Sequence, residues 1–193
     1  MLNKQAKILS DGQIEKVLTF LSSGRNCTRN RVMFLLSMHG LRSIEIASLE
    51  LSMLTDAEGN LAEQIALEDK ASKGKSGRII FINADLKKAL ELYLEERRDH
   101  DSEYLIVTER SNGFSANAVS VFFKRLYSKV GLEGVSSHSG RRTFITRAAR
   151  KISQAGGSLK DVQALVGHRH LTTTQAYVIQ DVDAQRSVVS LIY

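Results

Sequence analysis

The residues best suited to chemistry stand close together between Ser136 and Tyr177. His138 and Arg141 are three positions apart at the start of an apolar-periodic stretch, so both can point from one helical face at a single target. His168 follows a Val-Gly pair that ends a second helical pattern, and Tyr177 comes nine residues later. The segment therefore offers cations, groups that donate or shuttle protons, and a hydroxyl nucleophile, which is the set needed to attack a phosphodiester.

The arginines and the tyrosine have complementary parts in such a reaction. A guanidinium presents a fork of donors to the non-bridging phosphate oxygens, and this interaction strengthens as charge builds on those oxygens in the transition state. A phenol, with an ordinary pKa of about 10, is mostly protonated at neutral pH and needs an electropositive site or a nearby base to attack. Tyr177 is therefore the predicted nucleophile, and Arg141 is predicted to bind the phosphate.

Five short motifs resemble those of a known family. H-S-G-R at 138–141, V-G-H at 166–168 and Tyr177 resemble the H-x-x-R, L-G-H and tyrosine boxes of the tyrosine recombinases, the site-specific DNA recombinases that include phage integrases, Xer and Cre. The family's first arginine lies upstream in a G-x-R-x-x-E context, which G-L-R-S-I-E at 40–45 fits. Its lysine lies on a β-hairpin between these boxes, which S-K-G-K-S-G-R at 72–78 fits.

The resemblance implies a role for each catalytic residue. Tyr177 would form a 3′-phosphotyrosyl link and release a 5′-hydroxyl, which Lys73 would protonate as general acid; Lys75 is the rival candidate for that lysine. His138 and His168 would hydrogen-bond the phosphate and assist proton transfer, a role worth on the order of 10² to 10⁴ in rate. Since the bond energy stays in the covalent link, no ATP, metal or other cofactor is expected. The implied catalytic set is Arg42, Lys73, His138, Arg141, His168 and Tyr177.

Basic residues gather in the stretch that runs from Ser120 to Lys151, where eight lysines and arginines stand against one acid, Glu133. Such a stretch can follow DNA phosphates if its helices present it on one side, and a merely solvated basic surface is the alternative. The resemblance places the helix that ends near Val130 against the DNA major groove. The predicted DNA contacts are Lys75, Asn117, Ser120, Lys124, Arg125 and Arg142.

The chain departs from the family's pattern in two residues and in length. Gly140 stands where leucine is frequent, and Arg142 stands where a second histidine often follows. Most family members also carry an N-terminal helical domain that clamps the other face of DNA, and nothing before Ser10 could form it. The chain is therefore expected to be either a compact recombinase made of the catalytic domain alone or the catalytic fragment of a longer integrase.

The composition is that of an ordinary globular protein, and its positive charge favours a polyanionic partner, although many proteins that bind nothing acidic carry such a charge. The 193 residues suit one domain, with 42% hydrophobic residues, 25% charged residues and a formal net charge of +6. No apolar run approaches the roughly 20 residues that span a bilayer, and the first residues lack the apolar region of a signal peptide. The single cysteine, Cys27, excludes an internal disulfide and fits a reducing compartment. The protein is expected in the cytoplasm, associated with the nucleoid, without membrane contact.

Helical periodicity dominates and predicts the elements that position the site. Helices are predicted from Ser10 or Asp11 to about 23, from Ser115 or Asn117 to 130, and over 27–38, 43–49, 85–98, 141–153, 159–166 and a short segment that holds Tyr177. Alternating apolar residues predict three strands at 49–53, 64–67 and 78–82, with Lys73 at a hairpin tip. The prediction is a mainly α fold with a small three-stranded antiparallel β-sheet, as in the tyrosine recombinase catalytic domain.

The predicted domain organisation has three parts. Residues 1–9 form a loosely ordered lead, residues 10–181 form the catalytic domain, and residues 182–193 form a C-terminal segment. This segment ends in V-V-S-L-I-Y, an apolar run that either covers its own core or docks on a neighbour. Exchange of such a segment between protomers is what the resemblance implies.

Three functions fit the pattern. The leading hypothesis is a site-specific DNA recombinase of integrase or invertase type; the alternatives are a nicking-closing enzyme similar to type IB topoisomerases and a non-catalytic DNA-binding regulator. The expected partners are double-stranded DNA and further copies of the chain, as a dimer to tetramer on DNA, and a DNA-bending accessory protein is left open. No metal site is predicted, because His168 and His170 would diverge on a helix and no Asp, Glu or Cys cluster completes a shell.

Overall fold

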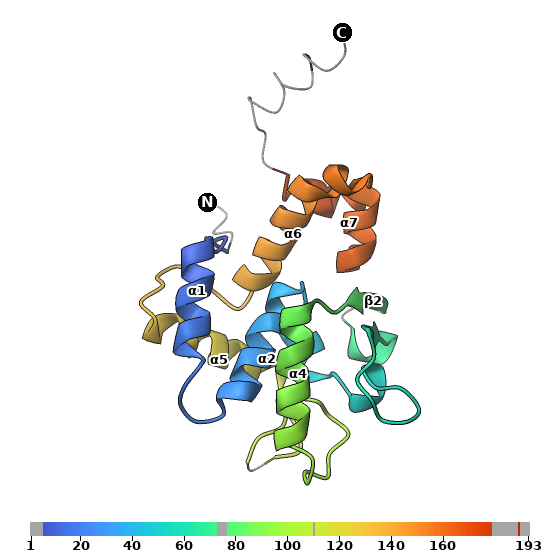
Figure 1. Cartoon of the computed structure of the whole chain (residues 1–193). Helices are drawn as coiled ribbons and strands as arrows, with labels where there is room; N and C mark the ends of the chain where they lie inside the picture. Colours follow the sequence, from blue (N-terminus) through green and yellow to red (C-terminus); the bar gives the residue numbers. More distant parts are fainter. Residues whose placement is uncertain (1–5, 73–76, 110, 179–188, 190–193) are drawn as a thin grey trace.

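The computed structural model describes residues 6–72, 77–109, 111–178 and 189. The helices form a larger body and a smaller C-terminal layer above it, residues 139–178 (Figure 1). The helices of the body are α1 (Asp11–Phe20), α2 (Cys27–Met38), α3 (Ser43–Ala47), α4 (Ala84–Glu96) and α5 (Ala116–Lys129). Those of the layer are α6 (Ser139–Lys151), η3 (Ile152–Ala155), α7 (Leu159–Val166) and α8 (Leu171–Gln175). None of the helices in the described ranges is long and apolar enough to cross a membrane.

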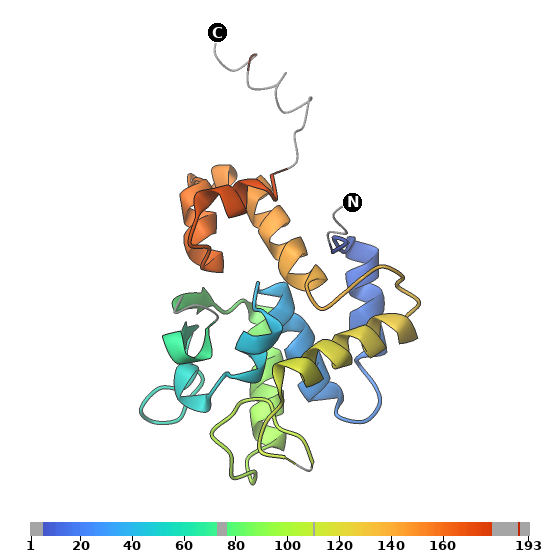
Figure 2. The same ribbon diagram turned by 180° about the vertical axis from the view of Figure 1, so that it is seen from behind.

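The central helix of the body is α2. Its residues from Val32 to Ser37 are all buried, and a helix buried around its whole circumference must be covered on every side. Helix α4 packs along it, the start of α6 meets it from above, and α3 packs against α5, which lies behind the other helices in Figure 1 and in front of them in Figure 2. Arg42 immediately precedes α3, so packed helices hold it in place.

The core divides unequally between the two parts. The main cluster of buried residues spans Leu9 to Val130, with Phe34 and Phe123 fully buried. Among the described residues, a separate cluster in the C-terminal layer has Ile145, Val162 and Val166 as its buried members. The layer therefore has little apolar burial of its own, and polar contacts contribute much of its attachment to the body.

Polar residues begin and end the helices much as the sequence predicts. Ser10 accepts a hydrogen bond from the Gln13 backbone N–H and completes a capping box at α1. Helices α2 and α7 have the predicted bounds.

Leu9 lies within the segment predicted as a loose lead, yet it is 1% exposed, and its backbone N–H donates to Thr143 Oγ1 at 2.8 Å.

The sheet has two strands within the described residues, so the prediction of a third at 49–53 is wrong. Strands β1 (Gln64–Leu67) and β2 (Arg78–Phe81) are antiparallel, and the short helix η2 (Asp69–Ala71) follows β1. Residues 51–53 form the 3₁₀ helix η1 (Leu51–Met53). Leu49 and Met53 would share one face of a strand, but the adjacent Met53 and Leu54 are both buried in the same core, which the helical turn permits and strict alternation does not.

Gly140 explains one departure from the family's pattern, because α6 crosses α2 closely at this residue. A Cβ atom at Gly140 would lie 3.0 Å from Ser37 Cβ and 3.1 Å from the Ser37 carbonyl carbon, which leaves no room for leucine. We expect Gly140→Ala to lower the free energy of unfolding by about 1–3 kcal/mol through overpacking, outweighing alanine's better helix propensity. Urea denaturation measures the change.

Gly12→Ala is the matched control, since Gly12 also lies in a helix but a Cβ there would meet nothing within 4 Å. That variant should be neutral or slightly stabilised. Equal stability of Gly140→Ala and the wild type would show that the crossing is not as tight as described.

Candidate active site

A pocket of about 760 Å³ brings five of the six predicted catalytic residues together. Its walls come from the start of α3, the first turn of α6 and the segments that follow α7 and α8. None of the described residues that line it is an acid, so the pocket is electropositive. The predicted catalytic residues in its lining are Arg42, His138, Arg141, His168 and Tyr177. Lys73 and its rival Lys75 lie outside the described residues.

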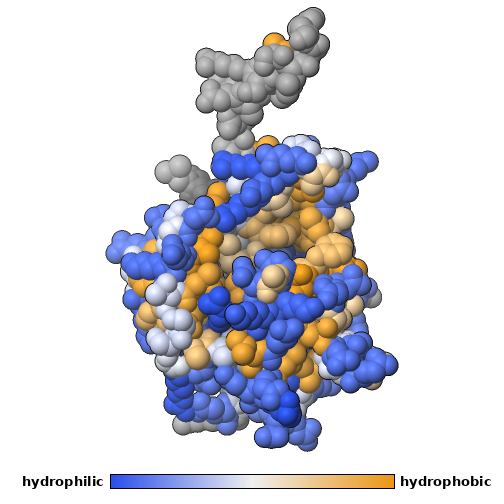
Figure 3. All heavy atoms as spheres, in the orientation of Figure 1, coloured by the Kyte–Doolittle hydropathy of each residue, from blue (hydrophilic) through white to orange (hydrophobic). Residues whose placement is uncertain are grey.

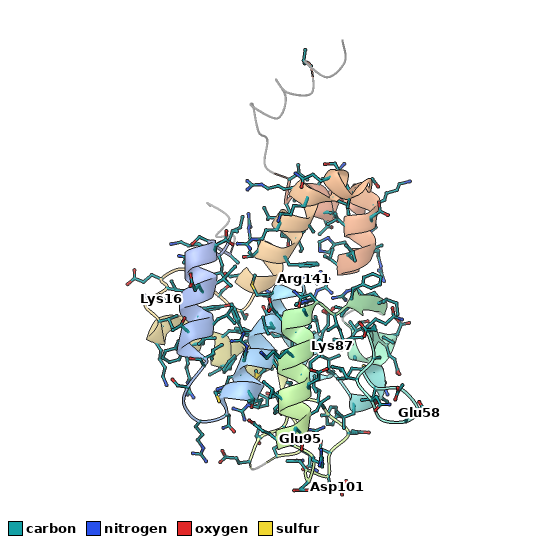
Figure 4. All side chains as sticks on the ribbon, in the orientation of Figure 1. Lys16, Glu58, Lys87, Glu95, Asp101 and Arg141 are labelled. Carbon is teal, nitrogen blue, oxygen red and sulfur yellow. The ribbon has the colours of Figure 1, made fainter. Side chains whose placement is uncertain are left out.

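Arg141 lies where the C-terminal layer meets the body (Figure 4). It is 6% exposed, and its guanidinium donates to the carbonyl of Gly40 and, at 2.8 Å, to that of Val166. Burial and then the charge of Arg42 lower the pKa of Arg141 to about 9, so it stays charged at neutral pH. Two backbone carbonyls thus aim a buried cation at the pocket and join α7 to the body.

Glu45 is fully buried and braces two arginines. It accepts hydrogen bonds from the Arg42 backbone N–H at 2.8 Å and from Arg42 Nη1 at 2.5 Å. Arg78 Nη1 and Nη2 donate to the two carboxylate oxygens at 3.0 and 2.9 Å. Burial alone would raise the pKa of Glu45, but the hydrogen bonds and charges of Arg78 and Arg42 outweigh it and lower the pKa to about 2. Glu45 therefore holds Arg42 in place through both its backbone N–H and its guanidinium.

Arg78 was not predicted as a site residue, yet it connects three parts of the site. Besides holding Glu45, it donates from Nε to the Leu165 carbonyl at 3.1 Å and from Nη2 to the Gly40 carbonyl at 3.4 Å. The Gly40 carbonyl therefore accepts hydrogen bonds from both Arg78 and Arg141. The φ of Gly40 is +86°, a backbone conformation that favours glycine at this position. The sequence indicated Arg78 only as an arginine at the start of an apolar strand.

His168 lies directly after Gly167, whose left-handed conformation ends α7. Its Nδ1 is 3.0 Å from Thr174 Oγ1, and the Thr174 side chain is fully buried. Burial and the charges of nearby arginines, Arg141 foremost, lower the pKa of His168 to about 4. The imidazole is therefore neutral at physiological pH, and the contact with Thr174 orients its ring and couples it to α8. Thr174 was not predicted as a site residue, although the sequence shows a run of three threonines from Thr172 to Thr174.

Tyr177 lies two residues beyond α8 rather than within it. Its ring stacks on that of His168, with centroids 5.8 Å apart and an interplanar angle of 27°. The guanidinium carbon of Arg142 lies 5.7 Å from the centroid of the same ring. The half-buried phenol ring is thus in contact with an imidazole and a cation beside the arginine-lined pocket.

The other predicted residues divide between the pocket and the surface. His138 is exposed at the N-terminal end of α6 and lines the pocket, as do Ser120 and Arg142. The remaining predicted DNA contacts on α5 are all exposed and outside this pocket: Asn117, Lys124 and Arg125.

A second cleft of about 1360 Å³ runs between β2 and α7 and shares Arg42, His168 and Thr173 with the first pocket. Its apolar lining includes Ile79 and Phe81, and Figure 3 shows apolar side chains in the hollow between the C-terminal layer and the body. In the described parts of the chain, no three His, Cys, Asp or Glu side chains lie close enough together to hold a metal ion.

Comparison with known proteins identifies the family. A sequence model of the phage integrase family matches residues 7–183. The chain is 33% identical over 175 residues to tyrosine recombinase XerA of Thermococcus onnurineus (strain NA1), which covers 89% of this chain and 57% of that protein. It is 28% identical over 174 residues to XerC of Lactobacillus leichmannii, which covers 86% of this chain and 55% of that protein. The chain thus spans little more than half the length of these relatives.

Solved structures share the fold. The crystal structure of XerA recombinase matches with a TM-score of 0.75 at 25% identity, over 99% of this chain and 65% of that one. The structure of XerH site-specific recombinase bound to difH substrate matches with a TM-score of 0.73 at 22% identity, over 98% of this chain and 55% of that one. The chain therefore belongs to the phage integrase family and has the fold of its tyrosine recombinase catalytic domain.

Proposed function

We propose that this chain is a site-specific DNA recombinase of integrase or invertase type, which cleaves and rejoins DNA through a covalent 3′-phosphotyrosine. The observation that carries the proposal is a pocket that contains Tyr177, Arg42 and Arg141 and has no acid among the described residues of its lining. A site with that charge accepts a phosphodiester and favours the charge that develops on it during attack. The titles of related structures, such as XerH with difH substrate, describe complexes with DNA and support the proposed substrate.

The proposed reaction follows from the roles of the lining residues. Arg42 and Arg141 bind the non-bridging oxygens, while the phenolic oxygen of Tyr177 attacks phosphorus and loses its proton. A P–O bond to tyrosine forms, the bond to the 5′-oxygen breaks, and Lys73 protonates that oxygen. Neutral His168 and exposed His138 hydrogen-bond the phosphate and assist proton transfer. Attack by a 5′-hydroxyl on the phosphotyrosine reverses these steps, so no ATP or metal takes part.

The decisive experiment incubates the chain with supercoiled plasmid and candidate target DNA, in EDTA and without ATP, before denaturation in SDS. We expect a protein–DNA adduct, with mass spectrometry placing the nucleotide on the peptide that contains Tyr177. Strand exchange only between paired sites supports the recombinase, whereas relaxation of plasmids regardless of sequence favours the topoisomerase-like alternative. Binding without an adduct on any DNA would contradict both and favour a regulator.

Assembly on DNA is part of the proposal. We propose that copies of the chain assemble as a dimer to tetramer on paired sites, within the cytoplasm at the nucleoid, with a DNA-bending protein as a candidate accessory. The proposed exchange of residues 182–193 between protomers is supported by their apolar end, V-V-S-L-I-Y. Except for Val189, this segment lies outside the described residues.

Thr174→Val tests the proposed part of His168. Valine keeps the buried shape of Thr174 but removes the hydroxyl 3.0 Å from His168 Nδ1, so the imidazole loses the contact that orients it. We expect the single-turnover cleavage rate at saturating DNA to fall roughly 10-fold, as one lost buried hydrogen bond implies. Quench-flow sampling on labelled DNA measures this rate.

Thr172→Val is the matched control, because Thr172 is exposed on the same helix. It should cleave at the wild-type rate. If Thr174→Val also did so while remaining folded, His168 would not depend on this contact.

A further inference from the structure

Arg142 differs from the other arginines of the site in what surrounds it. Arg42, Arg78 and Arg141 each donate to a carboxylate or to backbone carbonyls. For Arg142, no hydrogen bond or ion pair from the guanidinium to any described residue is found, and its Nε is buried without a partner. A half-buried cation without an acceptor is costly, so a structural role through hydrogen bonds does not account for its placement.

The contact that Arg142 does make is with the nucleophile. Its guanidinium carbon lies 5.7 Å from the centroid of the Tyr177 ring, within the range of a cation–π interaction. Arg141 and Arg142 are adjacent on α6, so their side chains leave the helix about 100° apart. Arg141 reaches the Gly40 and Val166 carbonyls, while Arg142 reaches the tyrosine.

We infer that Arg142 is a positioning residue for the Tyr177 nucleophile, acting through its guanidinium on the phenol ring; the inference rests on the proposed recombinase function. The ring becomes richer in electrons as its hydroxyl loses a proton during attack. Attraction to the cation is then stronger in the transition state than in the ground state, so the contact accelerates cleavage rather than tightening DNA binding. Arginine stays positively charged throughout the physiological pH range, whereas a histidine at this position would lose its charge within that range.

The competing interpretation makes Arg142 an ordinary phosphate contact, and kinetics separates the two. For Arg142→Ala in the full chain, we expect the single-turnover cleavage rate at saturating DNA to fall roughly 10- to 30-fold, from loss of a cation–π contact in a desolvated site. The dissociation constant for DNA should change much less. Arg142→Lys should recover part of the rate, because an ammonium keeps the cation but lacks the planar fork.

Arg150→Ala is the matched control, since it removes a cation from the exposed surface of the same helix, outside both pockets and outside the predicted DNA contacts. It should leave both the cleavage rate at saturating DNA and the dissociation constant for DNA unchanged. If Arg142→Ala weakened DNA binding but left the rate at saturating DNA unchanged, the inference would be overturned in favour of a phosphate contact.

A second measurement tests the contact independently of activity. In protein with ¹³C-labelled tyrosine rings, the Tyr177 resonance is identified by its absence in Tyr177→Phe. It should shift in Arg142→Ala and remain closer to its wild-type position in Arg142→Lys, both without DNA. An unmoved resonance refutes the inference. If the Tyr177 resonance shifts in Arg142→Ala but the wild-type chain forms no adduct with DNA, the proposed function is refuted and the contact between Arg142 and the ring is established.

Discussion

Tyr177→Phe is expected to bind target DNA as tightly as the wild-type chain and to form no covalent adduct with it. Phenylalanine retains the ring that stacks on His168 and lies beside Arg142, so the pocket keeps its shape and charge. It lacks the phenolic oxygen, so no bond to phosphorus can form. Denaturing gels of labelled DNA measure the adduct, and fluorescence anisotropy measures binding.

Tyr104→Phe is the control for the loss of the covalent adduct in Tyr177→Phe. Tyr104 lies in the loop before α5 and lines neither of the two site pockets. It should form the adduct at the wild-type rate. An adduct that persisted in Tyr177→Phe would place the nucleophile on another residue and contradict the proposed reaction.

Glu45→Gln should have the largest effect on stability. Glutamine keeps the shape of the side chain but removes the one buried negative charge that both Arg42 and Arg78 bind, and it can no longer accept from two guanidinium groups through both oxygens. Breaking a buried ion pair from one side costs about 3–5 kcal/mol, and we expect a loss of that order in urea denaturation. Cleavage should slow as well, since Arg42 loses its brace.

Glu63→Gln is the matched control, because the Glu63 side chain is 80% exposed where it pairs with Lys87. Surface pairs contribute little, so this variant should stay within about 0.5 kcal/mol of the wild type. If Glu45→Gln were equally mild, the buried network would not stabilise the fold.

The same network predicts an acid sensitivity. The pKa of Glu45 falls from an ordinary 4.5 to about 2 in the folded chain, so its contribution is complete above 4.5 and is lost as the pH falls toward 2. The wild-type free energy of unfolding should therefore decline more steeply across that window than that of Glu45→Gln. Denaturation curves at a series of acidic pH values measure both slopes.

Much of the scaffold could be predicted because local chemistry determines it. Helix α7 begins at the residue after Ser158 and ends before left-handed Gly167, signals that depend only on neighbouring residues. The supposed strand at 49–53 failed because Leu49, Met53 and Leu54 bury against residues distant in sequence. Alternation alone could not distinguish that packing from a strand.

The residues of the site also fall into two groups: those that local sequence indicates and those that only the fold brings together. Residues of recognisable type and spacing, such as Arg141 and Tyr177, could be proposed from the sequence, and the structure places both in one pocket. Arg78 and Thr174 act on other residues, Glu45 and His168, whose proximity only the fold establishes. Nothing in the spacing of Arg78 indicated that it would share the Gly40 carbonyl with Arg141.

The unequal division of the core has a consequence for motion. His168 and Tyr177 belong to the layer whose buried cluster is Ile145, Val162 and Val166, whereas α2 lies in the main cluster. Local opening costs less where fewer apolar contacts break, so the amides of α7 and α8 should exchange with deuterium before those of α2. Tyr177, the proposed nucleophile, therefore lies in a part of the chain that should open before α2 does, while the body stays folded.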